Sequence, residues 1–369
     1  MLPSEGLPAA SLCELGAELP VAFDVDVVVA GGSLAGVEAA CAAAEKGAKV
    51  LLVESRPYLG HDLCGAQRLW LDEDEAPETR LTKQLFGTEK VVSPFAVKRS
   101  LDQALIDGGI QFLTGTFAGE LLVRADGSPG GITIVNRSGR QAVRAKVIID
   151  ATEHAAVTRQ SGARFRPFTP GVKDFRMIVV GGELVEGQGI QGRELPIVYR
   201  SPSRRPPKRK GKRGPQDYPV YEYTLRLEMP SDSFRALSAA LSRARARVQS
   251  SGIVDQAEYL AHSPENTIVP VTSGGELGAF QPAGVKCLYV LNAYAGLPRD
   301  EMQKRIRPVS LAPVGREIGI AAAETARGLS APKEIGFKGA PKGGREFALA
   351  AAPASFRFRD CPKLELADH

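Results

Sequence analysis

The residues with the clearest capacity for chemistry form a glycine-rich turn, Gly31-Gly32-Ser33-Leu34-Ala35-Gly36, followed about twenty residues later by Glu54. Such a turn can present backbone N–H groups and the positive end of a helix dipole to a diphosphate. The carboxylate of Glu54 can accept hydrogen bonds from ribose hydroxyls. Together the two features predict that an adenine dinucleotide binds through the turn and Glu54.

The turn can work only between a strand and a helix, and the flanking residues predict both. Residues 25–30 are rich in valine, which is typical of a strand buried on both faces. Residues 34–46 predict a helix that ends at Gly47, and residues 49–53 predict a second strand closed by Glu54. We therefore expect a βαβ unit in which Ser33 replaces the central glycine, with a hydroxyl that can donate to a phosphate oxygen.

This pattern of buried strands and helices stops in mid-chain and returns near the C-terminus. Residues 56–90 suggest mostly surface loop with one short helix, and residues 165–281 turn polar and Pro-rich, with strand-like pieces and an Arg-rich helix over 231–249. A buried-strand pattern returns at 287–291, and a small-residue helix is expected over 313–327. This interruption predicts a discontinuous nucleotide-binding domain.

We accordingly expect four regions. They are a leader over 1–23, a discontinuous dinucleotide-binding domain over 24–160 and 283–328, an inserted β-rich substrate domain over 161–282, and a C-terminal tail over 329–369.

The charge of the 369-residue chain is concentrated in one segment. The formal net charge is +5, but eight basic residues lie in 200–213 without an acid, so the remainder carries 5 − 8 = −3. Prolines and glycines interrupt this run and no aromatic residue is interleaved for base stacking. We interpret it as a solvated loop and do not expect nucleic acid as a partner.

The five cysteines are widely spaced, with no CxxC pair and no Cys/His cluster at zinc spacing, so no metal site is predicted. Free thiols suggest a reducing compartment. The first twenty residues lack a basic n-region and a clean apolar stretch, and no run reaches the roughly 18 apolar residues of a membrane span. We expect a cytoplasmic protein without a membrane span.

Three further segments carry a family resemblance. Glu54-Ser55-Arg56-Pro57-Tyr58-Leu59-Gly60 resembles the continuation of the second strand in flavoproteins of the glutathione-reductase type, and residues 147–152, Val-Ile-Ile-Asp-Ala-Thr, resemble their second shared signature. Residues 285–327 are similar to their C-terminal strand and helix. Over 24–160 and 283–327 the chain thus resembles the FAD-dependent oxidoreductase family.

This resemblance implies an α/β fold, a Rossmann-like FAD/NAD(P)-binding three-layer domain with an inserted β-rich substrate domain, and FAD as the cofactor. Beyond the turn and Glu54, it implies the following cofactor-binding residues: Ser55, Arg56, Gly60, His61, Phe117 near the adenine, Ala151, Thr152, Glu153 and Asn292. The sequence departs from the family at three of these positions, because His61 and Glu153 replace glycines and Asn292 stands near a usual Gly-Arg or Gly-Asp pair.

Two residues are candidates for catalysis under this resemblance. His61 could act as a general acid or base beside the flavin, or be an ordinary loop histidine. Arg305, like Arg307, could compensate a reduced flavin's negative charge or bind a substrate carboxylate, or lie on the surface.

The leading hypothesis is an FAD-dependent oxidoreductase that moves a hydride or two electrons between a small molecule and the flavin, with NAD(P)H or another electron partner acting transiently. The alternatives are a non-catalytic relative that has lost FAD and an NAD(P)-dependent dehydrogenase.

Overall fold

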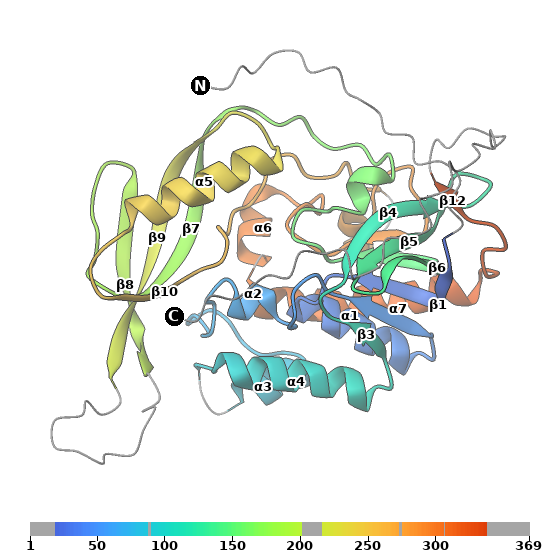
Figure 1. Ribbon diagram of the computed structural model, residues 1–369, viewed down its shortest axis with the longest axis horizontal. Helices are drawn as coiled ribbons and strands as arrows, with labels where there is room; N and C mark the ends of the chain where they lie inside the picture. The colour runs from blue at the N-terminus through green and yellow to red at the C-terminus, as the bar shows by residue number, and fades with distance from the viewer. Residues whose placement is uncertain (1–18, 88–89, 201–215, 273–274, 306, 338–369) are drawn as a thin grey trace, which may run out of the picture. The chain divides into compact units, whose positions relative to one another are not determined.

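Parallel strands form the part of the main sheet that carries the glycine turn. The computed structural model describes residues 19–87, 90–200, 216–272, 275–305 and 307–337. The parallel strands are β1 (Val21–Ala30), β2 (Val50–Val53), β3 (Gln111–Leu113), β6 (Gly139–Asp150) and β11 (Leu288–Val290). They lie in the order β11-β6-β1-β2-β3. Figure 1 labels three of them, β1, β3 and β6. Val27 and Val29 of β1 enter one core and Val28 and Ala30 enter another, because alternate side chains of a strand face opposite sides.

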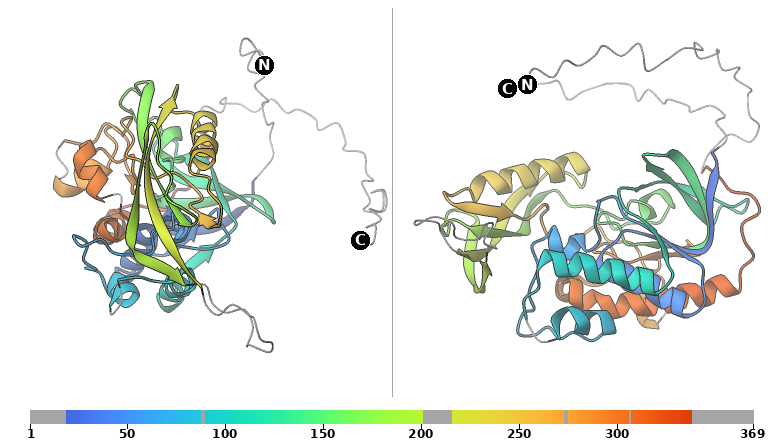
Figure 2. Two further views of the ribbon diagram at one scale, coloured as in Figure 1. Left: turned by 90° about the vertical axis from the view of Figure 1, so that its left-hand side faces the viewer. Right: turned by 60° about the horizontal axis from the view of Figure 1, so that its bottom comes forward.

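Helices cover one face of this sheet. They are α1 (Leu34–Glu45), α4 (Pro94–Asp107) and α7 (Pro308–Arg327), with α3 (Arg80–Phe86) packed beside α4 (Figure 2). The backbones of α1 and α7 almost touch, since a Cβ built on Gly319 would lie 2.2 Å from Ala39 O and one built on Gly315 would lie 2.3 Å from Ala35 O. Small residues on both helices therefore allow this approach.

Antiparallel strands cover the other face. β4 (Phe117–Val123) and β5 (Pro129–Asn136) pair in a hairpin, β5 continues onto the first half of β6, and β12 (Gly336–Phe337) adds to β4. Leu121 and Ile132 of this meander share a core with Val28 and Leu51 of the parallel strands. Helices, parallel sheet and meander give the three layers expected of a Rossmann-like α/β fold.

A second, antiparallel sheet has the order β10-β7-β9-β8. Its strands are β7 (Gly171–Gly181), β8 (Ile190–Arg200), β9 (Asp217–Met229) and β10 (Ile253–Gln256). The helix α5 (Phe234–Arg247), capped by the Ser233 hydroxyl, packs small side chains such as Ala240 and Ala244 into the core of this sheet. The remaining elements are α2 (His61–Cys64), α6 (Arg299–Arg305), and two 3-10 helices, Thr158–Gln160 and Gly275–Phe280.

The expected strands and helices of the βαβ unit are confirmed, but two other expectations are wrong. The last helix begins at Pro308 and not at Pro313, because Pro308 also suits a first turn and the helix accommodates Pro313 in its second. Residues 56–90 are not mostly surface loop. Leu69 and Leu71 are buried in the main core, and Trp70 between them is buried in the core of the second sheet.

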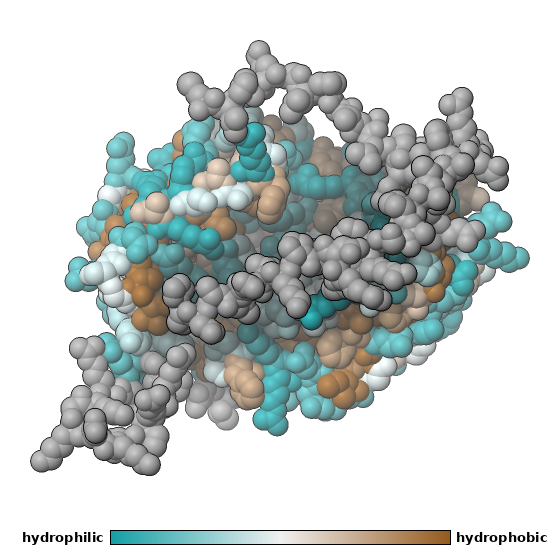
Figure 3. Space-filling view, in the orientation of Figure 1, coloured by the Kyte–Doolittle hydropathy of each residue, from teal (hydrophilic) through white to brown (hydrophobic). Residues whose placement is uncertain are grey.

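Exposed large apolar side chains such as Phe95, Phe117 and Phe234 belong to different elements, and the face in Figure 3 mixes hydrophilic and hydrophobic residues. Such scattered positions need no partner. Most of the basic segment predicted to be a solvated loop lies outside the described residues; its first residue, Arg200, pairs with Asp217 at 2.7 Å.

Candidate functional site

The carboxyl ends of the parallel strands converge on the glycine turn. Backbone hydrogen bonds join Gly31 N to Val53 O (2.8 Å) and Ala151 N to Ala30 O (2.7 Å). Leu291 N donates to Asp150 O at 2.8 Å, so β11 is fixed at the same edge. In open α/β sheets this edge is where ligands bind, at the point where the strand order reverses.

Gly31 is required by the shape of the turn. Its φ of +112° is in a region that side chains rarely adopt, and a Cβ there would lie 2.3 Å from Ala151 O. The next helix begins at Leu34, and the Ser33 hydroxyl accepts the Gly36 amide hydrogen at 3.1 Å as its N-cap. The Ser33 side chain therefore stabilises the first turn of α1 and keeps its own hydrogen free to donate.

Glu54 ends β2 with its carboxylate turned back onto the glycine turn. It is 2% exposed and accepts hydrogen bonds from Gly32 N (2.6 Å), Arg56 N (2.8 Å) and the Ser55 hydroxyl (3.1 Å). Burial on its own raises the pKa of Glu54, but the contact with His61 and the two backbone amides outweigh it and lower the pKa to about 2. The group is thus an ion throughout the neutral range.

His61 lies between two carboxylates. Its Nδ1 is 3.3 Å from Glu54 Oε2 and its Nε2 is 3.5 Å from Glu153 Oε1, contacts that act through charge because Nδ1 makes no well-aligned hydrogen bond. Burial lowers the pKa of His61, but the contact with Glu54 and the negative charges of the nearby acids raise it by more. The pKa of His61 therefore lies above its ordinary value. The imidazolium form is therefore favoured at this position.

Arg56 completes this charged group. Its Nη2 is 2.7 Å from Glu153 Oε1, and its Nε donates to Glu258 Oε2 at 3.2 Å. Arg56 thus joins the edge of the main sheet to the segment that follows β10.

The carboxylate of Asp62, a residue of α2, lies against the N-terminus of α1. Both of its carboxylate oxygens are 3.1 Å from Leu34 N, and the side chain is partly buried. Burial, aided by the negative charge of Glu54, raises the pKa of Asp62, although His61 and the Leu34 amide oppose the shift. The segment is brought there by Gly60, whose N–H donates to Gly32 O at 2.7 Å.

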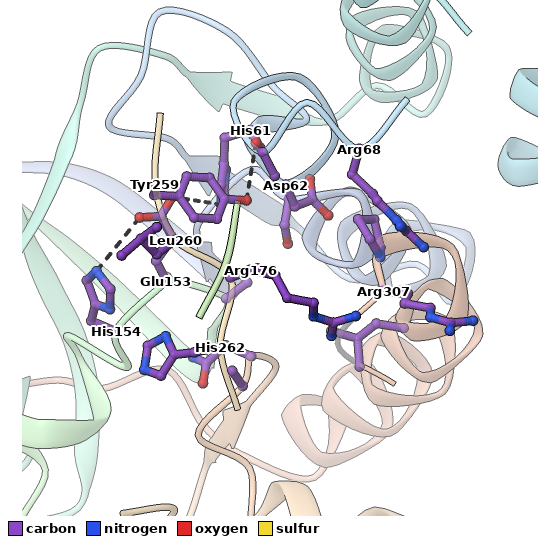
Figure 4. Close-up of a pocket in the computed structure, with 18 of the residues that line it drawn as sticks. His61, Asp62, Arg68, Glu153, His154, Arg176, Tyr259, Leu260, His262 and Arg307 are labelled. Atoms are coloured by element: carbon purple, nitrogen blue, oxygen red, sulfur yellow. Dashed lines mark hydrogen bonds and ion pairs between the residues drawn. The ribbon is translucent and has the colours of Figure 1, made fainter. Parts of the chain in front are cut away.

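A cavity of about 160 Å³ opens beside this edge. Residues of the main sheet line one side, among them Ser33, Ala151 and Asn292, and residues of β7, β9 and the segment after β10 line the other. Figure 4 shows the labelled side chains that surround it: His61, Asp62, Arg68, Glu153, His154, Arg176, Tyr259, Leu260, His262 and Arg307. Much of the remaining lining is apolar, which suits a small organic molecule.

The structure brings some predicted residues to this cavity and leaves others away from it. Ser33, His61, Ala151, Glu153 and Asn292 line the cavity. Thr152 lies at the same edge, where its hydroxyl donates to Asp150 Oδ1 at 2.6 Å, and the Asn292 amide donates to Asp150 O at 3.1 Å.

Phe117 and Arg305 do not line the cavity. Phe117 is 60% exposed at the start of β4, and Arg305 is 42% exposed on α6, where its Nε donates to Glu301 at 3.1 Å. Arg307, two residues further on, does line the cavity.

Several lining residues could not be foreseen from the sequence. Arg68, Arg176, Glu222, Tyr259 and His262 come from segments without a known motif, and tertiary packing alone brings them together. The one sequence signal is Arg176 itself, a cation between the apolar residues Phe175 and Met177 of a strand.

Neither a membrane-spanning helix nor a metal cluster is found within the described residues. No helix there is long and apolar enough to span a membrane. No group of three or more His, Cys, Asp or Glu residues in the same ranges is arranged to hold a metal ion.

The glycine turn, the acid that closes the next strand and the adjoining cavity define a Rossmann-like dinucleotide-binding protein. Residues 26–175 match the family described as FAD dependent oxidoreductase. This match covers less than half of the chain; it supports the resemblance seen in the sequence and FAD as the cofactor.

Three individual proteins are similar to parts of this chain. A thiamine thiazole synthase of Aeropyrum pernix is 29% identical over 211 residues, which are 48% of this chain and 75% of that protein. Among solved structures, BexE, studied for oxidation during BE-7585A biosynthesis, has a TM-score of 0.50 and 15% identity over 83% of this chain. OxyS, an anhydrotetracycline hydroxylase from Streptomyces rimosus, has a TM-score of 0.47 and 14% identity over 82% of this chain. The chain spans 63% of each of these two structures, and the similarity to BexE supports the fold alone.

Proposed function

We propose that the protein transfers a hydride or two electrons between a small molecule in the cavity and FAD held at the carboxyl edge of the main sheet. The observation that carries the proposal is that one cavity touches both the glycine-turn edge, at Ser33 and Ala151, and the second sheet, at Arg176 and Ile178. A molecule bound there would lie between the cofactor side and the inserted sheet.

The backbone of the turn fits a diphosphate, because Gly31 and Gly36 leave no Cβ between the turn and Ala151. In the described conformation the Asp62 carboxylate accepts the Leu34 amide hydrogen, which is one of the donors that a diphosphate would use. A bound diphosphate therefore requires Asp62 to move or to be neutral. We propose that the amides of residues 31–36 bind the diphosphate once Asp62 has moved or become neutral.

The remaining cofactor contacts are proposed from the positions of residues at the carboxyl edge of the main sheet. Glu54 would accept from ribose hydroxyls, and Arg56 would offset the negative charge nearby. The backbone at Ala151, Thr152 and Asn292 would border the flavin end, since these residues follow β6 and β11 at the same edge. FAD, when bound, supplies the two-electron chemistry, and the chain supplies binding, orientation and charge compensation.

His61 is proposed as a residue that holds a proton beside the cofactor. Its imidazole is 3% exposed and lies between Glu54 and Glu153, so that it can carry a positive charge there. A positive charge at this place offsets the two neighbouring carboxylates, Glu54 and Glu153, at the edge where the cofactor would bind.

The test is the visible spectrum of freshly purified protein, with the released cofactor identified after denaturation. A flavin spectrum and one FAD per chain support the proposal, and anaerobic titration with NADH and NADPH then tests whether either is the electron partner. A colourless preparation that does not bind added FAD would contradict it and favour a non-catalytic protein.

A further inference from the structure

Three guanidinium groups line the same cavity, and one of them has no acid of its own. Arg68 is 2.5 Å from Asp72 and 3.2 Å from Glu75, and Arg307 is 2.6 Å from Asp74. In the described part of the chain, no hydrogen bond or ion pair engages the guanidinium of Arg176. Asp72, Glu75 and Asp74 therefore pair with Arg68 and Arg307 and not with Arg176.

Glu222 is the lining carboxylate through which Arg176 could be neutralised. Its Oε2 is taken by Arg193, whose Nε donates to it at 2.8 Å, and its Oε1 lies 3.9 Å from Arg68. Glu222 therefore pairs with two other arginines and leaves Arg176 as the available cation. Burial and the positive charges of Arg68 and Arg307 lower the pKa of Arg176, and Glu222 opposes them only in part.

The fold holds Arg176 in place at its backbone. Arg176 N donates to Ala261 O at 2.8 Å and Ala261 N donates to Arg176 O at 2.9 Å, while the other edge of β7 pairs with β9. Figure 4 shows the side chain extending from β7 across the cavity toward the side where Arg307 lies. A guanidinium is always charged, and one held in a partly dry cavity is stabilised by an anion that can accept two parallel hydrogen bonds.

The rest of the lining limits what can carry that anion. Ile178, Leu260, Leu291 and Leu311 are apolar and lie around the same cavity. We propose that the substrate is a small molecule with an apolar body and a carboxylate, and that Arg176 binds the carboxylate. Arg176 is then the residue that selects the substrate class and positions the molecule relative to the glycine-turn edge; this inference rests on the proposed function for its consequence in catalysis.

The experiment compares carboxylates with their neutral amides. Benzoate and phenylacetate are titrated against benzamide and phenylacetamide by calorimetry, in purified protein whose FAD content has been measured from its absorption. Wild-type protein should bind the acids at least about tenfold more tightly than the amides, because a charge-assisted pair is being made. Equal binding of acids and amides, or no binding of the acids, overturns the inference.

Variants assign the effect to one side chain. Arg176→Met should abolish the preference for acids, and Arg176→Lys should keep part of it because the charge remains. Arg226→Met is the matched control, since Arg226 on the neighbouring strand is 68% exposed and outside the cavity, and it should leave the preference unchanged. A preference that survives in Arg176→Met also overturns the inference.

The two proposals fail in different ways. Protein that lacks FAD but still prefers the acids contradicts the redox function and leaves the carboxylate site standing. Protein with full FAD and no preference for acids contradicts only the site.

Discussion

The carboxylate of Asp62 lies over the first turn of α1, with both oxygens 3.1 Å from the Leu34 amide nitrogen. A helix N-terminus attracts anions, so this side chain lies where we propose that the diphosphate binds. The consequence is competition between an internal acid and an external diphosphate for the same amide.

Replacing Asp62 by Asn should strengthen FAD binding and make it less dependent on pH. In wild-type protein FAD affinity should fall as pH rises through the raised pKa of Asp62, because the ionised carboxylate repels the diphosphate while the neutral acid does not. Quenching of FAD fluorescence at a series of pH values measures the affinity. Asp300→Asn, at the exposed start of α6, is the control. Parallel pH profiles for wild type and Asp62→Asn would contradict the competition.

Replacing Glu54 by Gln should remove a pH-dependent part of the stability. The folded-state pKa of Glu54 is about 2 and its ordinary value is 4.5, so its contribution is present above pH 4.5 and lost as pH falls toward 2. The difference corresponds to on the order of 3 kcal/mol at pH 7. Urea unfolding should show the full deficit for the variant at pH 7 and less than half of it, about 1.4 kcal/mol, at pH 3.

The control for this series is Glu301→Gln, which removes an exposed ion pair with Arg305 and should cost less than about 0.5 kcal/mol. A deficit for Glu54→Gln that stays constant with pH would show that shape, and not charge, accounts for its role. FAD affinity measured on the same variant tests the proposed ribose contact, which predicts weaker binding.

Gly31→Ala should disrupt the turn far more than a comparable change elsewhere. The new methyl group would lie 2.3 Å from Ala151 O in a backbone conformation that side chains rarely adopt, so the turn must open. Gly47 also has a positive φ, of +83°, but a Cβ added to it would meet no atom within 4 Å. We expect Gly47→Ala to cost about 1 kcal/mol by strain, and Gly31→Ala to cost several times as much and to lose FAD. Equal melting temperatures for the two variants would refute this explanation.

Gly319→Ala should separate α1 from α7. Its methyl group would be 2.2 Å from Ala39 O, and backbone atoms cannot turn aside as a side chain can. We expect thermal unfolding to show a loss of more than about 2 kcal/mol. Gly328→Ala at the end of the same helix meets only Thr325 O at 3.6 Å and should be neutral or stabilising. A loss no greater than that of Gly328→Ala would contradict the close-packing argument.

The sequence was sufficient for the turn, the βαβ unit and the family resemblance because these depend on local patterns. Gly31, Gly36 and Glu54 are recognisable from spacing alone, and the valines of β1 predict its burial. The positions of Asp62 and Arg176 depend instead on tertiary contacts, namely Gly60 N to Gly32 O and the bridge between Arg176 and Ala261. Arg305 illustrates the same limit, because it lies at the end of α6 with a 42% exposed side chain, whereas Arg307, just before α7, lines the cavity.

The contact between α1 and α7 joins parts of the chain that are made at very different times. The ion pair between Glu45 and Arg316, for example, spans 271 residues. A ribosome must therefore synthesise most of the protein before the small-residue face of α1 can be covered. The face of α1 that α7 covers is therefore exposed in every nascent chain until α7 has been translated, and a chain interrupted before that point would keep it exposed.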